Sequence, residues 1–254
     1  MSSTDAANEL TPTGKLRAAI NFGNPVLAQK DSGTGEPRGV SVDIARELAR
    51  RLEVALEVVP FDAAGKVFDA LKSSAWDVAF LAIDPKRAIA IDFTAPYVII
   101  EGSYMVRADS PLRTIDDVDR PGVRIAVGNG SAYELYLSRT IKHAEIVRAS
   151  TGNEAIDMFV RDGLESVAGV KSPLRKFVER RPDLRVMDGR FMLIEQAMGT
   201  PKGRPAAIRY LRAMIEELKA SGFVAAALER SGQHDALVAA CVRLEQEFGA
   251  PRRI

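Results

Sequence analysis

The stretch Lys86-Arg87-Ala88-Ile89-Ala90-Ile91-Asp92-Phe93-Thr94-Ala95-Pro96-Tyr97 decides the fold of this chain. It follows Asp77–Ile83, a nearly continuous apolar run of the kind found in strands buried on both faces of a sheet. Lys86 and Arg87 come directly after Asp84-Pro85, so the residues alone are typical of surface charges in a loop. A short alternating run then ends in Asp-Phe-Thr-Ala-Pro-Tyr. The lone Arg after a buried strand is the first candidate for a chemical role.

Strands and helices alternate along most of the chain, which predicts α/β units with largely parallel sheets. The predicted strands are 16–21, 54–60, 77–83, 123–127, 144–149, 166–170, 184–187 and 191–198. The predicted helices are 42–52, 65–73, 154–161, 174–180, 206–220 and 223–230, with another after the turn 128–133. These elements form two clusters, one before about residue 100 and one after about residue 120, separated by a predicted loop at 107–122.

Composition limits the function classes. The chain has 254 residues, enough for one large domain or two small ones, and a formal net charge of +1. This balance argues against a nucleic-acid-binding protein, which usually carries a basic face. One Cys and two separated His, His143 and His234, leave no internal disulfide and no metal cluster, and we expect no cofactor. No apolar run approaches the roughly 18 residues of a membrane helix.

The segment from Arg87 to Tyr97 resembles a signature of the family 3 extracellular solute-binding proteins, which serve many amino-acid transport systems. Three further stretches resemble elements of the same family in its usual order: Gly39–Asp43 before a helix, Val127–Ser131 after a strand, and Lys202–Phe223 near the end. Each motif is weak alone, but together they cover about residues 14–232. We therefore identify the chain as similar to this family.

The resemblance implies an α/β fold of the type II periplasmic-binding-protein kind, with two α/β lobes joined by two hinge strands. Lobe 1 would be residues 1–101 plus 195–254, and lobe 2 residues 102–194. The strands would cross near Ile100-Glu101-Gly102 and Ile194-Glu195-Gln196. The ligand would bind between the lobes at the carboxyl ends of the strands, and binding would close the hinge.

The resemblance also implies a carboxylate clamp at Arg87, because a guanidinium matches a carboxylate through two parallel hydrogen bonds. A second contact would come from the loop Asn129, Gly130, Ser131 and Ala132, whose backbone N–H groups at a helix start suit an anion. Ser131 is also a good N-cap residue, and both roles are compatible. Tyr133 stands where a dinucleotide fingerprint has its third Gly, so such a site is not expected.

The sequence departs from the amino-acid receptors of the family at three places. The spacing from Asp77 to Arg87 is about two residues shorter than the family's pattern, and the usual Ser or Thr contacts beside the Arg are missing. Lys171 stands where the family has an Asp that holds the ligand's α-amino group. A cation there repels an ammonium, so either the ligand is not an ordinary α-amino acid or another carboxylate, Glu101 or Glu195, replaces the Asp. An aromatic stacking residue is also missing after the first strand; Phe22 or Phe61 lines the pocket in its place, or both belong to the core.

The expected function is a non-enzymatic receptor that delivers a small carboxylate to the membrane permease of an ABC transporter, as a monomer. The alternative is a cyclohexadienyl or arogenate dehydratase on the same fold, with Arg87, Lys171 and Glu101 or Glu195 as its acid and cations. A sensor domain is a third option, although no membrane span or signalling segment is attached to support it. Residues 1–14 are polar and lack the apolar core of a signal peptide. The resemblance favours a periplasmic protein whose signal has been removed over a cytoplasmic one.

Overall fold

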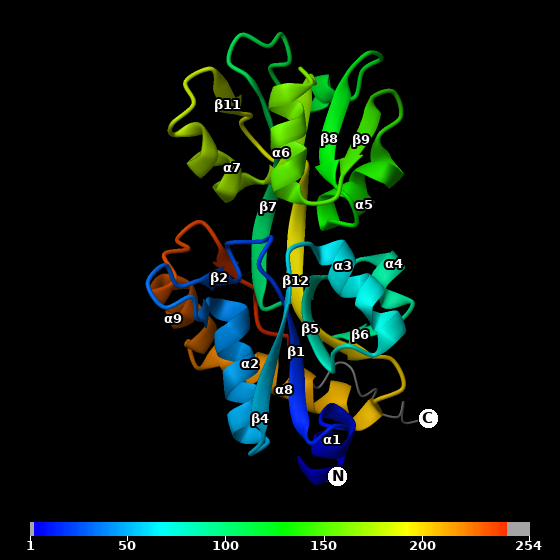
Figure 1. Cartoon of the computed structure of the whole chain (residues 1–254), viewed down its shortest axis with the longest axis vertical. Helices are drawn as coiled ribbons and strands as arrows, with labels where there is room; N and C mark the ends of the chain where they lie inside the picture. Colours follow the sequence, from blue (N-terminus) through cyan, green and yellow to red (C-terminus); the bar gives the residue numbers. More distant parts are fainter. Residues whose placement is uncertain (1–2, 243–254) are drawn as a thin grey trace, which may run out of the picture.

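Two α/β bodies joined by two long strands make up the protein in the computed structural model, which describes residues 3–242 (Figure 1). We call the body at the bottom of Figure 1 the lower lobe and the body at the top the upper lobe. The predicted α/β class is confirmed. The ends of the predicted lobe 1, residues 1–2 and 243–254, lie outside the described residues.

The strands lie close to the predicted ranges. They are β1 (Lys15–Asn21), β2 (Gln29–Lys30), β3 (Pro37–Arg38), β4 (Ala55–Phe61), β5 (Val78–Ala82), β6 (Ile91–Phe93), β7 (Val98–Arg107), β8 (Arg124–Gly128), β9 (Glu145–Ala149), β10 (Ser166–Val170), β11 (Leu184–Val186), β12 (Met192–Pro201) and β13 (Leu237–Val238).

The helices also follow the predicted pattern, with additions at the N-terminus and around Arg87. They are α1 (Ser3–Leu10), α2 (Val40–Arg51), α3 (Ala64–Asp69), η1 (Ala70–Ser73), α4 (Pro85–Ala88), η2 (Ile115–Val118), α5 (Ala132–Thr140), α6 (Gly152–Arg161), α7 (Lys171–Val178), α8 (Pro205–Ala220) and α9 (Phe223–Arg230). None of the helices in residues 3–242 is both long enough and apolar enough to cross a membrane.

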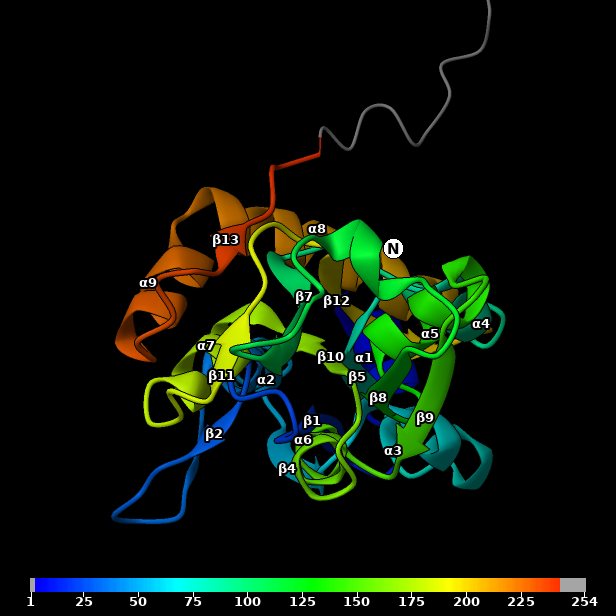
Figure 2. The ribbon, with the colours of Figure 1, turned by 90° about the horizontal axis from the view of Figure 1, so that it is seen from above.

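One continuous path of strands runs through both lobes, in the order β4-β1-β5-β12-β7-β10-β8-β9. In the lower lobe β4, β1 and β5 are parallel, and β12 pairs antiparallel with β5. In the upper lobe β9, β8 and β10 are parallel, and β7 pairs antiparallel with β10. Figure 2 shows α9 and α3 on opposite sides of the long strands, with the β2–β3 hairpin projecting from the body. The carboxyl ends of the parallel strands of both lobes therefore point toward the region between the lobes.

The two long strands, β7 and β12, pair antiparallel with each other where they connect the lobes. Ile100 lies opposite Ile194, and Gly102 opposite Met192. The crossing points that we predict from the sequence therefore fall on strands that face each other. The residue boundaries of the two lobes stay a prediction.

The loop that we predict at Lys86 and Arg87 is instead the short helix α4. Asp84 caps it by accepting a hydrogen bond from the backbone N–H of Lys86 at 2.9 Å, and Pro85 occupies its first turn. Proline is favoured there because its missing N–H has no partner in a helix start. One turn of helix carries Arg87 back toward the end of β5 instead of into solvent, and its side chain is 1% exposed.

The apolar cores follow the predicted periodicities. β5 is buried along its whole length, as its continuous apolar run predicts, and its residues pack into two different clusters. The amphipathic helix α2 buries Ile44 and Leu48 in the lower core. The upper lobe has clusters of its own around Ile125 and Phe159. Each lobe therefore has packed clusters of its own, and Ala132 and Val170 of the upper lobe also pack against the lower core.

Candidate functional site

A cavity of about 120 Å³ lies between the lobes and is lined by residues of both. From the lower lobe come residues after β1 and β4 and the end of β5, including Asn24, Asp62 and Ala82. From the upper lobe come the ends of β8 and β10, including Gly128 and Gly169. This position at the carboxyl ends of parallel strands is the place where open α/β sheets bind ligands.

Arg87 lines this cavity and is almost completely buried. Its Nη1 donates to the carbonyl of Ala82 and its Nη2 to the carbonyl of Gly130, both at 2.8 Å. Its Nε has no hydrogen-bond partner among the described residues. Burial lowers the pKa of the guanidinium to about 10, and the charges of Asp84 and Glu134 oppose that shift. A buried cation with a free donor is thus held at the interface of the lobes.

The predicted loop after β8 lies at the cavity. Asn129, Ser131 and Ala132 line it, and Gly130 lies between them, with its carbonyl accepting the bond from Arg87. The Ser131 hydroxyl accepts from the backbone N–H of Glu134 at 3.1 Å and is the N-cap of α5, as predicted.

Helices α5, α6 and α7 all begin at the cavity. Their N-cap residues are Ser131, Thr151 and Val170, and all of them line the cavity. The N-terminus of a helix carries a partial positive charge and unpaired backbone N–H groups. Glu134 and Glu154 offset part of that charge in the first turns of α5 and α6, and α7 has no acidic residue in its first turn. Positive potential from the upper lobe therefore comes chiefly from the start of α7.

Lys171 and Glu101 contact each other and do not line the cavity. The Lys171 Nζ donates to the Glu101 carboxylate at 2.8 Å, and Arg190 donates to the same carboxylate at 2.7 Å. The hydrogen bond from Lys171 lowers the pKa of Glu101, and the bond from Arg190 acts in the same direction. The structure thus joins two of the predicted site residues beside the hinge strands and outside the cavity.

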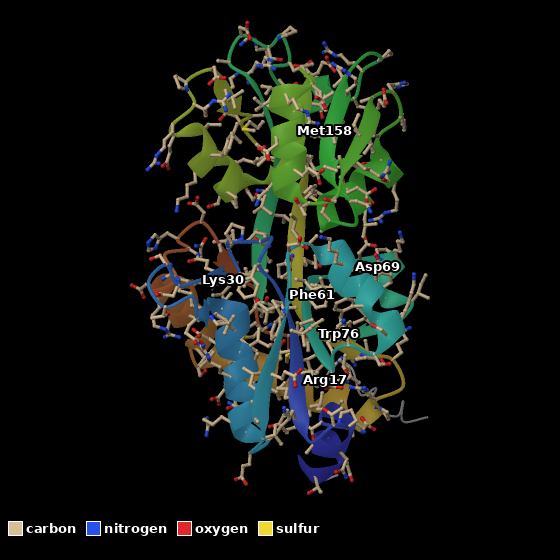
Figure 3. The ribbon with its side chains drawn as sticks, in the orientation of Figure 1. Arg17, Lys30, Phe61, Asp69, Trp76 and Met158 are labelled. Carbon is tan, nitrogen blue, oxygen red and sulfur yellow. The ribbon has the colours of Figure 1, made fainter. Side chains whose placement is uncertain are left out.

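Glu195, Phe22 and Phe61 also lie away from the cavity lining. Glu195 is exposed on β12. Phe22 packs against the lower core with the Lys30 ammonium 5.5 Å from its ring centre. Phe61, labelled in Figure 3, packs in the cluster around Trp76, which is the core alternative stated for it above.

Several lining residues were not anticipated from the sequence. Gln196 follows the exposed Glu195 on β12 and is 5% exposed. Phe80 supplies an aromatic wall from β5. Thr151 and Asn153 come from the start of α6. These two residues could have been found from the rule that residues just after parallel strands gather at one edge of a sheet. The rule applies to β9, which precedes Thr151 and Asn153, as well as to β8 and β10.

Direct contacts between the lobes hold them together. Arg139 of α5 donates to Asp84 of the lower lobe at 2.8 Å, in addition to the bond between Arg87 and Gly130. The backbones of Gly65 and Gly130 also approach closely. The approach leaves no room for a side chain, since an added Cβ on Gly130 would lie 2.6 Å from the Gly65 Cα. The structure is therefore a closed arrangement of the lobes.

The chemistry of the lining is that of a binding site. Among the described lining residues the only carboxylate is Asp62, which is exposed and pairs with Lys66 at 2.8 Å. A dehydratase needs a positioned general acid, and Asp62 is poorly placed for that role. No three His, Cys, Asp or Glu side chains in residues 3–242 come together as a metal site.

Comparison with known proteins identifies a family and a curated relative that are similar to this chain. The sequence profile of the bacterial extracellular solute-binding proteins, family 3, matches residues 11–234. The glutamine-binding protein of Geobacillus stearothermophilus is 20% identical over 204 residues, which cover 78% of this chain and 77% of that protein.

Solved structures are also similar. Holo ArgBP from T. maritima has a TM-score of 0.72 at 25% identity, over 88% of this chain and 98% of that one. An ancestral amino-acid-binding protein, a precursor of cyclohexadienyl dehydratase, has a TM-score of 0.73 at 23% identity, over 88% and 98%. The predicted type II periplasmic-binding-protein fold is confirmed, and the named relatives are binding proteins, not enzymes.

Proposed function

Because this chain belongs to the bacterial extracellular solute-binding proteins of family 3, we propose that it binds a small carboxylate-bearing solute, an organic acid or an amino-acid-like compound, between its lobes for uptake by an ABC transporter. The partner is the membrane permease of that transporter. The protein works as a periplasmic monomer and catalyses no reaction.

The observation that carries the proposal is Arg87. A guanidinium that is 1% exposed, borders the cavity and keeps an unpartnered Nε is costly to hold without an anion. A ligand carboxylate would take the Nε and share an Nη in the bidentate geometry that guanidinium favours. It would also offset the cost that burial imposes on the charged guanidinium.

The helix starts support the same ligand chemistry. The N-termini of α5, α6 and α7 meet at the cavity, and that of α7, which has no acidic residue in its first turn, favours a negative charge most. Arg87 approaches from the other lobe, so one carboxylate can interact with both lobes. A ligand that does so binds the closed form more tightly than the open form, which is what closure by a ligand requires.

A thermal-shift screen of amino acids, dicarboxylates, keto acids and aromatic acids tests the proposal, followed by titration calorimetry of each hit. We expect at least one carboxylate to raise the melting temperature, since a ligand of the folded state stabilises it by mass action. Arg87→Ala should abolish binding. Arg175→Ala, which removes an exposed arginine from α7, is the matched control and should bind normally. Unchanged affinity in Arg87→Ala, or stabilisation by uncharged solutes alone, would contradict the proposal.

A further inference from the structure

Gln196 holds a polar side chain at the cavity without a protein partner. It lies on β12 and shares a strand face with Ile194, two residues earlier, which also lines the cavity. Gln196 is 5% exposed, and its amide makes no hydrogen bond with any residue of the described chain. Its amide atoms are not among the fully enclosed polar atoms that lack a partner, so they remain accessible from the cavity that Gln196 lines. Its side-chain amide is therefore available to hydrogen-bond a ligand in the cavity.

Gln196 lies next to the Arg87 site. It pairs in register with Ala82 of β5, and the carbonyl of Ala82 accepts the hydrogen bond from Arg87 Nη1. A carboxylate held by Arg87 would therefore bring the neighbouring atoms of the same ligand toward Gln196. The residue is a neutral group able both to donate and to accept.

The electrostatics of the cavity oppose a cationic group on the ligand. Among its described lining residues the buried charge is Arg87, and the N-terminus of α7, which has no acidic residue in its first turn, adds positive potential. The carboxylate of Asp62 is exposed and neutralised by Lys66. Glu101 lies outside the cavity with Lys171 and Arg190 on its oxygens. Asp84 and Glu134 act on Arg87 but are paired with Arg139 and Arg148. An ammonium inside would thus meet the charge of Arg87 with no unpaired carboxylate to balance it.

We propose that the ligand is a small carboxylic acid whose second polar group is an uncharged oxygen, a 2-oxo or 2-hydroxy acid, and that the Gln196 amide recognises that oxygen. This inference rests on the proposed function, because it takes Arg87 as the carboxylate clamp. The amide N–H donates to an oxo or hydroxyl oxygen, and the amide carbonyl accepts from a hydroxyl. Selection by a polar group that must be matched discriminates strongly against compounds lacking it.

The apolar residues that line the rest of the cavity determine what the remainder of the ligand can be. Leu27 and Phe80 come from the lower lobe, and Ile156 and Leu174 from the upper lobe. A cavity of about 120 Å³ holds on the order of ten water-sized groups. A short branched hydrocarbon chain beside the two polar groups fits both the volume and the apolar walls.

Three compounds with one carbon skeleton isolate the second polar group: 4-methyl-2-oxopentanoate, 2-hydroxy-4-methylpentanoate and leucine. Titration calorimetry at pH 7 on the full chain should show binding of the oxo or hydroxy acid, with leucine at least about tenfold weaker. Gln196→Met, similar in size but without the amide, should reduce that preference. Gln196→Glu should shift the preference toward leucine, because a carboxylate there balances an ammonium. Circular dichroism and melting curves confirm that each variant is folded.

Equal or tighter binding of leucine by the unmodified protein would overturn the inference, and this measurement depends on no variant. Failure of all three compounds at millimolar concentration would overturn it too. The proposed function fails separately, if no carboxylate of the wider screen binds or if Arg87→Ala binds normally. A protein that binds leucine and needs Arg87 would keep the proposed function and lose the inference about Gln196.

Discussion

Arg139 of the upper lobe donates a hydrogen bond to Asp84 of the lower lobe at 2.8 Å. The Asp84 side chain is 4% exposed and the Arg139 side chain 46%. Because Asp84 also caps the short helix that carries Arg87, one carboxylate links the closed arrangement of the lobes to the position of the clamp.

Arg139→Ala should weaken closure. The variant loses one interlobe ion pair, and a half-exposed pair contributes about 0.5–1 kcal/mol, so ligand affinity should fall roughly two- to fivefold. Small-angle scattering should report a larger radius of gyration for the ligand-free variant. Arg161→Ala, which removes an exposed pair within the upper lobe, is the control. Identical scattering and affinity in the two variants would argue against a role for Arg139.

Gly65→Ala should hinder closure of the lobes without lowering the stability of the lower lobe. An added Cβ at this position would lie 2.8 Å from the Asn129 carbonyl of the other lobe. Alanine favours helix over glycine by roughly 0.5–1 kcal/mol, so α3 itself should gain stability when the lobes are open. We expect an unchanged or higher melting temperature together with weaker ligand binding. Scattering of the ligand-saturated variant checks this, and a fully closed particle with normal affinity would contradict it.

Lys171→Met should leave ligand affinity within about twofold of the unmodified protein, since Lys171 contacts Glu101 outside the cavity. Calorimetry with the ligand found in the screen measures this. A loss of affinity comparable to that of Arg87→Ala would return Lys171 to the site that the sequence predicts for it.

Glu101→Gln should show a pH-dependent stability defect. Hydrogen bonds from Lys171 and Arg190 lower the pKa of Glu101 in the folded state, so its contribution is present above the ordinary Glu pKa. That contribution is lost as pH falls through the lowered value. Urea unfolding at pH 7 should therefore find the variant less stable by about 0.5–1 kcal/mol, with the difference shrinking toward pH 3. A constant difference at both pH values would contradict this assignment.

Asp77→Ala should damage the lower lobe more than any variant above. Asp77 is fully buried and accepts hydrogen bonds from Arg17 and Arg204. Removing the carboxylate leaves two partly buried arginines without their partner, which costs on the order of 3–5 kcal/mol. Urea unfolding measures the loss. Asp69→Ala, at an exposed position in the same lobe, is the control and should change stability little.

Periodicity predicted the order and type of most elements because each strand and helix buries one face or both. The helix at Pro85–Ala88 escaped notice because a single turn has no periodicity; its signal was Asp84 before Pro85, a cap followed by a first-turn proline. No element was predicted within residues 1–14, but Ser3–Leu10 is a helix whose Leu10 is buried and which packs against α8.

Cavity residues could be predicted from the sequence where the position of the backbone alone places them at the cavity. They could not be predicted where the direction of the side chain decides whether they line it. Ser131 follows a strand and precedes a helix, so its place at the cavity follows from topology. On β12 neighbouring residues face opposite sides, and Glu195 and Gln196 are both polar, so only the pairing register tells which one lines the cavity. Lys171 opens α7, and the ion pair with Glu101 depends on a partner 70 residues away.

The contact between Gly65 and Gly130 sets a minimum gap between the lobes with two backbones, neither of which has a side chain that could move aside. A solute too bulky for the space between the lobes would keep the two backbones apart, and Arg139 would then not reach Asp84. The ion pair between Arg139 and Asp84 would therefore form with a solute that fits and would be absent with one that is too large. A transporter that docks across both lobes would meet a different outer surface for a fitting cargo than for an oversized one.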